Sequence, residues 1–298
     1  MQTKKTIMAC FVFAAICFAL FSFSSINVKA AGALIPGNVT VKSVPSVGTV
    51  TIWNSDGEDA AIDLSAGGTV TVTANATITD FNEWEDIANA SAVLYYSSAG
   101  DEDSNNTHIT NSTCALSEAD PEVDNNTIVA TCTFEMNYNA LPGTWHAKIT
   151  ATDNEALSSS NTGDREVNSN VGLEVDETSI NFGSMASGSN STEAASTTIN
   201  NMGNVNITPK VSGTNFSCTH GEIPVANVKY GENDVNYDLM GHSLSEDATP
   251  DSSNVIPYLD LISEETSQGS EYWTIQIPSD IGGVCSNYIT IDAEEVVE

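Results

Sequence analysis

Apolar and polar residues alternate along several short stretches of this chain. In Val70–Ile78 every even position is apolar, and the odd positions around them are threonine or asparagine. In Trp145–Ala151 the odd positions are apolar in the same way. Strict alternation of this kind is typical of a β-strand that buries one face. We therefore predict strands over 69–79 and 143–153.

The stretch 196–218 combines strand and turn signals. Its turn, 200–204, is rich in asparagine and glycine, which tolerate positive φ. After the turn, apolar and polar residues alternate in 205–208. We predict a strand, a turn and a second strand here, then a rim loop over the acidic stretch 231–254 and a further strand at 258–262.

These elements predict an all-β fold. We expect an extended segment at 31–48, an immunoglobulin-like antiparallel β-sandwich at 49–157, and a second antiparallel β-sandwich at 171–298. The segment 158–170 is rich in serine and asparagine, and we predict that it links the two domains.

Two stretches of the first half carry a resemblance. TVTVTANATITD at 69–80 and PGTWHAKITATD at 142–153 resemble the Ig-like and PKD-like modules of archaeal and bacterial surface proteins. The second half, with INFG, NMGNV and YWTIQIP, resembles the terminal β-sandwiches of archaeal surface proteins and, more faintly, camelysin-like filament subunits. The latter resemblance implies that 31–48 adds as a donor strand to a neighbour's open sheet.

The N-terminus has the pattern of a secretory signal peptide. Lys4 and Lys5 precede a long apolar run, and Val28-Lys29-Ala30 matches a signal peptidase site. We expect cleavage after Ala30, which makes 1–30 the signal peptide. The alternative is an uncleaved anchor formed by residues 7–26, because the apolar run is nearly long enough to span a bilayer.

Four cysteines follow the expected cleavage site, an even number that suits an oxidising compartment. Three pairings are open. The inward parity of the flanking residues favours Cys114–Cys132, and the local pairing then joins Cys218 to Cys285. A zinc site is disfavoured because the chain has no CxxC pair.

The chain is strongly acidic. After residue 30 it carries five basic residues against forty acidic ones, a net charge of −35. Such a charge disfavours nucleic acids and anionic membranes as partners. Bound Ca²⁺ would relieve the repulsion, and the weak candidates are Asp101, Asp103 and Asn105. An EF-hand is rejected because the loop glycine is missing and Ser112 replaces the bidentate glutamate.

Nine N-x-S/T sequons are candidate N-glycosylation sites, a mild excess over the roughly six expected from composition. Their asparagines are Asn38, Asn75, Asn89, Asn105, Asn111, Asn125, Asn190, Asn206 and Asn215.

No catalytic motif stands out, and the four histidines have no ligand spacing. We therefore expect no enzyme and no obligatory cofactor. The first hypothesis is a secreted, acidic, glycosylated structural or interaction protein of a prokaryotic cell surface, whose partners are surface proteins, glycans or itself. A binding module that uses Trp84 or Tyr95 is the second hypothesis, and a hydrolase is the third.

Overall fold

A computed structural model describes residues 37–54, 57, 60–99, 106–111, 113–118, 125–261 and 266–297. Residues 1–41 and 42–298 form separate compact units. Of the first unit only 37–41 are described, and they have no regular secondary structure. The predicted signal peptide and the calcium candidates Asp101, Asp103 and Asn105 lie outside the described residues.

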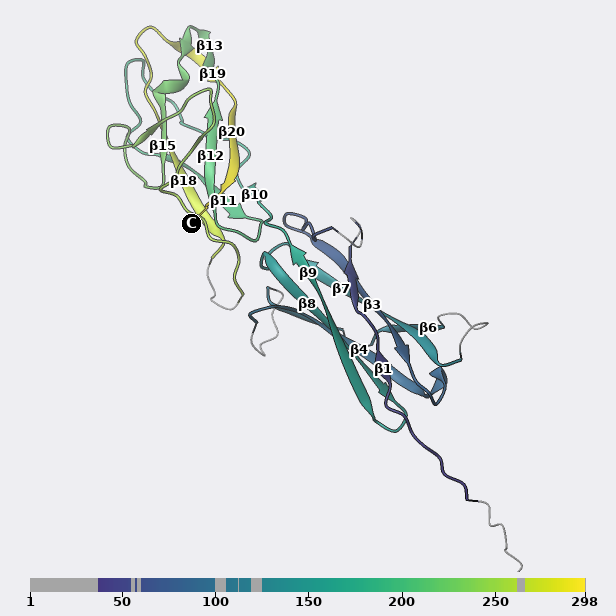
Figure 1. Cartoon of the computed structure of the whole chain (residues 1–298). Helices are drawn as coiled ribbons and strands as arrows, with labels where there is room; N and C mark the ends of the chain where they lie inside the picture. The colour runs from purple at the N-terminus through teal and green to yellow at the C-terminus, as the bar shows by residue number, and fades with distance from the viewer. Residues whose placement is uncertain are drawn as a thin grey trace, which may run out of the picture. The chain divides into compact units, whose positions relative to one another are not determined.

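Two sheets form the first half (Figure 1). Each pairing between their named strands is antiparallel. One sheet has the order β1 (Ser46–Val47), β3 (Thr69–Thr79), β7 (Thr127–Asn137), β6 (Ala115–Glu118), and β2 (Thr51–Trp53) also pairs with β3. The other has the order β5 (His108–Asn111), β4 (Ile87–Tyr96), β8 (Gly143–Asp153), β9 (Ser158–Val167).

The core of this half lies between the two sheets. Val72 and Ile78 of β3 and Trp145 and Ile149 of β8 are fully buried, as the alternation predicted. The indole of Trp145 donates a hydrogen bond to the Leu141 carbonyl, so its polar edge is satisfied inside the core. Trp145 is therefore a core residue and not an exposed sugar platform.

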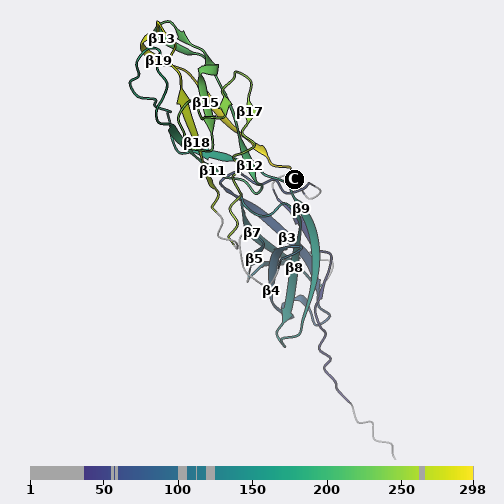
Figure 2. The ribbon, with the colours of Figure 1, turned by 90° about the vertical axis from the view of Figure 1, so that its left-hand side faces the viewer.

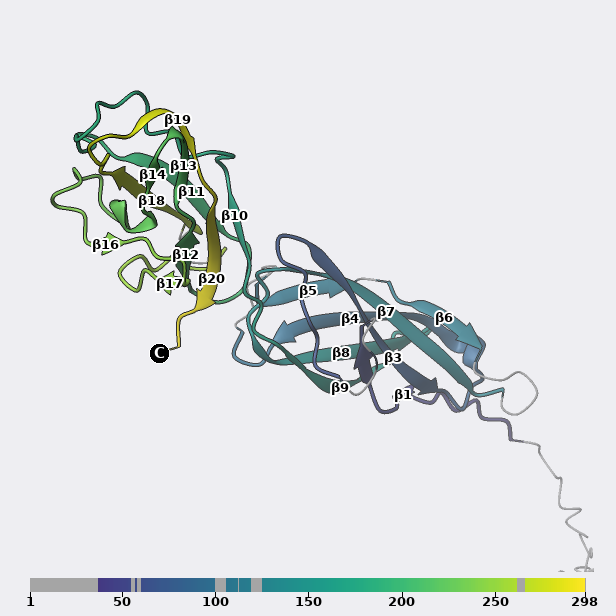
Figure 3. The same ribbon diagram turned by 90° about the horizontal axis from the view of Figure 1, so that it is seen from above.

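Three sheets form the second half. The largest has the order β10 (Leu173–Val175), β11 (Ala195–Asn201), β18 (Gln268–Ile275), β15 (Val228–Gly231), β16 (His242–Ser243). A second has β17 (Thr249–Pro250), β12 (Ile207–Gly213), β20 (Ile289–Glu295), and β12 and β20 lie side by side in Figure 3. The third has β14 (Glu222–Ile223), β13 (Phe216–His220), β19 (Gly282–Ser286), and β13 and β19 lie together at one end of this half (Figure 2).

The predicted strand, turn and strand over 196–218 form as β11 and β12, but they are not a hairpin. β11 belongs to the large sheet and β12 to the sheet of β17 and β20, so the turn carries the chain from one sheet to another. The strand predicted at 258–262 is wrong over the described residues, because 258–261 have no strand assignment.

The predicted linker 158–170 is also wrong over most of its length, because 158–167 form strand β9 paired with β8. Its polar side chains are used as hydrogen-bond donors to backbone carbonyls near β1 and β2. Ser159 Oγ reaches Pro45 O at 2.6 Å, and Arg165 Nε reaches Ile52 O at 3.1 Å. A Cβ on Gly163 would lie 2.2 Å from Val50 O, so this close approach requires glycine.

The predicted rim loop over 231–254 contributes more than a surface. Met240 and Leu244 in it are buried apolar residues, and Asp251 and Asn254 are buried polar ones. The stretch contains the short strands β16 and β17. Part of this acidic stretch therefore belongs to the core of the second half.

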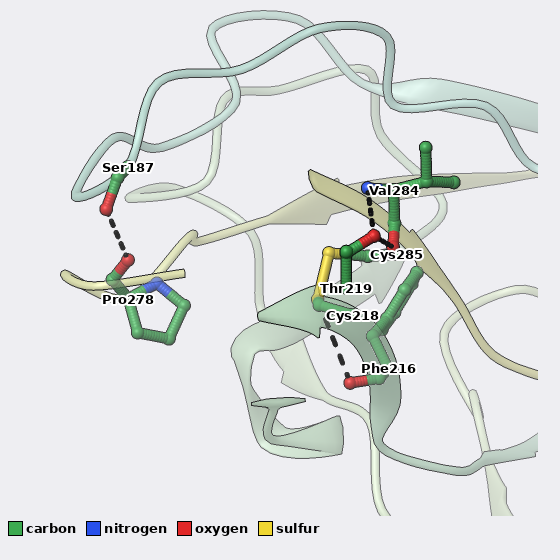
Figure 4. The surroundings of a disulfide bond; sticks show 7 residues. All are labelled: Ser187, Phe216, Cys218, Thr219, Pro278, Val284 and Cys285. Atoms are coloured by element: carbon green, nitrogen blue, oxygen red, sulfur yellow. Dashed lines mark hydrogen bonds between the residues drawn. A yellow bond between two sulfur atoms is a disulfide. The ribbon is translucent and has the colours of Figure 1, made fainter. Parts of the chain in front are cut away.

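Two disulfide bonds are present, Cys114–Cys132 and Cys218–Cys285, which is the local pairing. Cys114 and Cys132 are buried in the first core. Cys218 on β13 faces Cys285 on β19, and Figure 4 shows that bond with its neighbours Phe216 and Thr219.

Replacing Cys114 and Cys132 together by alanine is expected to lower the free energy of unfolding by about 3 kcal/mol, because an open chain gains loop entropy when it unfolds. Urea unfolding under oxidising conditions measures this loss. The matched control is the wild type with its disulfides reduced, which should lose at least as much. An unchanged unfolding midpoint in the variant would contradict the expectation.

In the described part of the chain, no helix is long and apolar enough to cross a membrane.

Candidate functional site

Along both β3 and β8 the series of inward-facing residues ends with an acidic residue. Asp80 follows β3 directly and continues its buried even positions. Asp153 is the last residue of β8 and continues its buried odd positions. Their exposed fractions are 0% and 2%. Each strand therefore places a buried carboxylate at the end of the sandwich.

A third carboxylate joins them from the connection between β3 and β4. Asp86 ends the short 3₁₀ helix η1 (Trp84–Asp86), and the next residue, Ile87, pairs with Asp153 in the ladder of β4 and β8. One carboxylate oxygen of each aspartate lies within 4.8 Å of one oxygen of both others. We call Asp80, Asp86 and Asp153 the aspartate cluster.

Asp80 uses one of its two carboxylate oxygens to hold the surrounding chain. Its Oδ1 accepts hydrogen bonds from Ser43 Oγ at 2.6 Å and from the Asn82 backbone N–H at 2.8 Å. Ser43 Oγ also lies 2.7 Å from Asn82 Oδ1. The Oδ2 of Asp80 is buried and has no hydrogen-bond partner among the described residues.

Asp153 follows the same scheme. Its Oδ1 accepts hydrogen bonds from the backbone N–H groups of Glu155 at 3.0 Å and Leu157 at 2.7 Å, which fixes the turn after β8. Its Oδ2 is buried and finds no hydrogen-bond donor in the part of the chain that the structure describes. The hydrogen bonds thus orient both carboxylates and leave one oxygen of each unused.

Asp86 is the member closest to a positive charge. Its Oδ2 has no hydrogen-bond partner among the residues that the structure describes, but it lies 3.7 Å from Lys42 Nζ. Lys42 also forms an ion pair with Glu155. The hydrogen bond to Glu155 raises the pKa of Lys42, and the charge of Asp86 adds to the effect, so the lysine is charged at neutral pH. Its side chain is 42% exposed and forms ion pairs with Asp86 and Glu155, and the charge of Asp153 also contributes to the raised pKa of Lys42.

The chemistry of this cluster is that of an oxygen-only donor set. It offers three carboxylates and neither nitrogen nor sulfur. Carboxylate oxygens suit hard cations, whereas zinc in proteins is held mainly by cysteine and histidine. Because Asp80 and Asp153 are closed off from solvent, they are poorly placed for acid–base work on a bound substrate.

A second group of buried acids lies in the other half. Glu271 on β18 and Asp251 after β17 are both 0% exposed. Burial raises the pKa of Glu271 to about 8, against the lowering effect of a 2.9 Å hydrogen bond from Asn254 Nδ2, and Asp251 raises it further. Glu271 Oε1 and Asp251 Oδ2 are both buried, and neither has a hydrogen-bond partner within the described parts of the chain. One proton held between the two carboxyl groups would satisfy both atoms.

The other carboxylate oxygen of Asp251 also has partners. Its Oδ1 accepts hydrogen bonds from the Ser253 hydroxyl and backbone, and it lies 3.5 Å from His242 Nε2. The His242 ring stacks on Tyr230 with centroids 5.4 Å apart. Burial of Tyr230 beside these acids raises its pKa to about 12. Glu271 and Asp251 are enclosed, so a proton shared between them would stabilise the fold and would not act on a substrate.

The predicted glycosylation sites are distributed over both halves. Asn105 lies outside the described residues, and none of the other eight asparagines is buried. Asn38, Asn89 and Asn125 are the exposed ones. Asn75, Asn111, Asn190, Asn206 and Asn215 are half-buried, and the side-chain amide of each takes part in a hydrogen bond. These sites stay predictions.

The aromatic candidates do not form one surface. Trp84 is partly buried and packs against the first core. Tyr95 lies against His146, with ring centroids 5.4 Å apart. Trp273 is fully buried, as its alternation predicted. The histidines His108, His146, His220 and His242 lie on four different strands, β5, β8, β13 and β16.

Two pockets with mixed polar and apolar linings open among the described residues of the second half, on residues that the sequence analysis did not select. One has a volume of about 460 Å³ and the other about 490 Å³, and both are lined by Ile180, Phe182 and Phe216. Residues 177–189 have no strand assignment. This part of the core is therefore covered by a segment that adds no strand to the sheets.

Sequence reasoning also missed the aspartate cluster. Acidic residues are so abundant in this chain that no pair of them is informative by spacing alone. The usable signal was parity, because Asp80 and Asp153 fall on the inward positions of the two clearest strands. An acid at an inward position needs a partner, and this requirement marks the site.

No protein-family model and no curated protein matches this sequence. Among solved structures, a chaperone–tip adhesin complex of CFA/I fimbriae aligns with a TM-score of 0.30 and 10% identity, over 80% of this chain and 77% of that one. The CsuC–CsuE chaperone–tip adhesin complex of Acinetobacter baumannii Csu pili aligns with a TM-score of 0.32 and 11% identity, over 83% and 92%. The C-terminal domain of the AgI/II polypeptide BspA of Streptococcus agalactiae gives 0.23 and 12%, over 85% and 100%. Likenesses this low carry no argument about the function of this chain.

Proposed function

We propose that this chain is a secreted, acidic structural or interaction protein of a cell surface and has no catalytic activity. The observation that carries the proposal is the pair of disulfide bonds, one in each half of the chain. Such bonds persist in oxidising compartments outside the cytosol. The partners that fit are other surface proteins, glycans or a second copy of the chain.

The buried acids support a passive mechanism. Among the described residues, the buried acidic groups lie in the aspartate cluster and at Glu271 and Asp251, and four of these five carboxyl groups are at most 2% exposed. Enclosed groups hold a fold together and cannot reach a substrate. The remaining acidic surface keeps the chain soluble and repels nucleic acid.

A second candidate is a binding module. Tyr95 and Trp84 both belong to the first half and are partly exposed. A module of this kind would show saturable binding to a glycan or a surface protein, and replacing Tyr95 or Trp84 by alanine would abolish the binding. Glycan-array binding by the unmodified protein, followed by these two variants, distinguishes this candidate from the first.

A third candidate is a filament subunit that assembles by donor-strand addition. Val39 and Val41 alternate with polar residues and are 84% and 71% exposed. The two pockets beside Ile180 and Phe182, which polar and apolar residues line together, are the kind of opening that a strand from another copy could fill. The proposal concerns a second copy of the chain and not a contact within one copy.

The test compares the chain that begins at Ala31 with one that begins at Lys42. The cut at Lys42 keeps Ser43 and β1, which belong to the first sandwich. Donor-strand assembly predicts filaments or oligomers by electron microscopy and light scattering for the longer chain alone. A matched control replaces Val39 and Val41 by serine and should behave like the shorter chain. Monomers in every case would contradict assembly and leave the first two candidates.

A further inference from the structure

The aspartate cluster has a deficit of positive charge. Asp80 and Asp153 are 0% and 2% exposed, and each keeps a buried Oδ2 without a hydrogen-bond partner among the described residues. Among the described residues, Lys42 forms ion pairs with Asp86 and Glu155 and interacts with Asp153 only through its charge, so this one exposed lysine does not balance three carboxylates. Burying a carboxylate without a partner is costly, and two such groups close together repel each other.

We propose that Asp80, Asp86 and Asp153 bind one Ca²⁺ ion at the end of the first sandwich. Calcium is bound by oxygen ligands at about 2.3–2.6 Å, so two ligands of one ion lie no more than about 5 Å apart. The three carboxylates meet this condition, with oxygens within 4.8 Å of one another. Calcium tolerates irregular geometry, and water would complete its shell.

The unpartnered carboxylate oxygens distinguish the aspartate cluster from an ordinary group of acidic residues. Hydrogen bonds to Oδ1 fix the orientation of Asp80 and Asp153 from opposite sheets. They leave the Oδ2 atoms, which are buried and unpartnered, as the natural ligands. A pre-oriented donor set costs less to organise when the ion binds.

The ion would join three pieces of chain. Asp80 ends the path of β3 in one sheet, Asp153 ends β8 in the other, and Asp86 leads into β4. Ser43, which precedes β1, is held on Asp80. Calcium would therefore close this end of the sandwich and fix the point where the N-terminal segment joins it.

The proposal is tested by thermal unfolding of the secreted protein in chelator and in about 10 mM calcium at constant ionic strength. If the dissociation constant lies near 10⁻⁴ M, as in extracellular modules, the expected rise in Tm is about 5–10 °C. Asp80→Asn and Asp153→Asn should lose this rise. Both variants keep the Oδ1 acceptor, and removal of a buried charge should raise their Tm in chelator above that of the wild type.

The matched control is Asp164→Asn, which removes an exposed charge from β9. This variant should keep the calcium response of the wild type. An absent response in the wild type, or an equal response in D80N, D153N and D164N, would overturn the proposal, because it would show only screening of the acidic surface. An equal response to magnesium would overturn the assignment to calcium.

If the asparagine variants fail to fold, calorimetric titration of the wild type decides the question. We expect one ion per chain, with binding that persists in about 0.5 M NaCl, since a buried site is screened weakly. Binding of many weak ions that disappears in salt would overturn the proposal.

Discussion

Replacing Glu271 by glutamine is expected to abolish most of the loss of stability that the second half undergoes between pH 5 and pH 8. The pKa of Glu271 is raised from 4.5 to about 8 in the folded protein. Below pH 4.5 the group is protonated in both states. Between the two pKa values the unfolded chain releases this proton and the folded chain keeps it, so stability falls as pH rises.

The size of this effect follows from the width of the interval. A shift of this size corresponds to a loss of roughly 3–5 kcal/mol by pH 8. Glutamine carries no charge, and its amide can donate to Asp251 as the protonated carboxyl does. We therefore expect E271Q to be more stable than the wild type at pH 8 and to differ little from it near pH 5.

Urea unfolding at both pH values measures the difference. The matched control is Glu174→Gln, which removes an exposed carboxylate from β10 in the same half. Its pH dependence should follow that of the wild type, because the general repulsion between surface acids remains. If E271Q keeps the pH dependence of the wild type, Glu271 does not hold a proton in the fold.

Replacing Trp273 by alanine is expected to cost about 3–5 kcal/mol of unfolding free energy, the usual range for a buried large aromatic residue. Trp273 is 0% exposed and packs on Tyr230 with ring centroids 5.8 Å apart. Its indole N–H donates a 3.0 Å hydrogen bond to Thr197 Oγ1. The substitution removes this packing and leaves a buried hydroxyl without its donor.

Two further variants show how much of this loss comes from the buried apolar volume and how much from the indole hydrogen bond. W273F keeps most of the apolar volume but lacks the indole donor, so we expect a smaller loss than in W273A. Trp84→Ala removes a tryptophan that is only partly buried, and its cost should also be smaller. Urea unfolding of the three variants gives the order. A loss in W84A equal to that in W273A would contradict the assignment of Trp273 to the core.

The strands that were predicted well are those that bury one face. β3 and β8 carry apolar residues at their inward positions, apart from Asp153 at the end of β8, and the structure gives them the predicted bounds of 69–79 and 143–153. The hairpin of β6 and β7 places Leu116 opposite Ala130, and the same parity brings Cys114 to Cys132. Period-two alternation contains the information needed for these choices.

The errors arose where polar side chains serve the fold. β9 has no apolar alternation, because its serine and asparagine side chains bind backbone carbonyls, as Ser159 does. Asp251 and Glu271 were likewise hidden, since an acid in the core is indistinguishable by sequence from the many acids on the surface. Such partners come from distant segments, and a single sequence does not show which segments meet.

A crystal structure of the protein grown with calcium is the most direct test of the aspartate cluster as a cation site. We expect one ion bound by an oxygen of each of Asp80, Asp86 and Asp153, at about 2.3–2.6 Å. Anomalous scattering would identify the metal as calcium. A cluster that holds only water in the presence of calcium, or whose carboxylates bind Lys42 instead, would contradict the account.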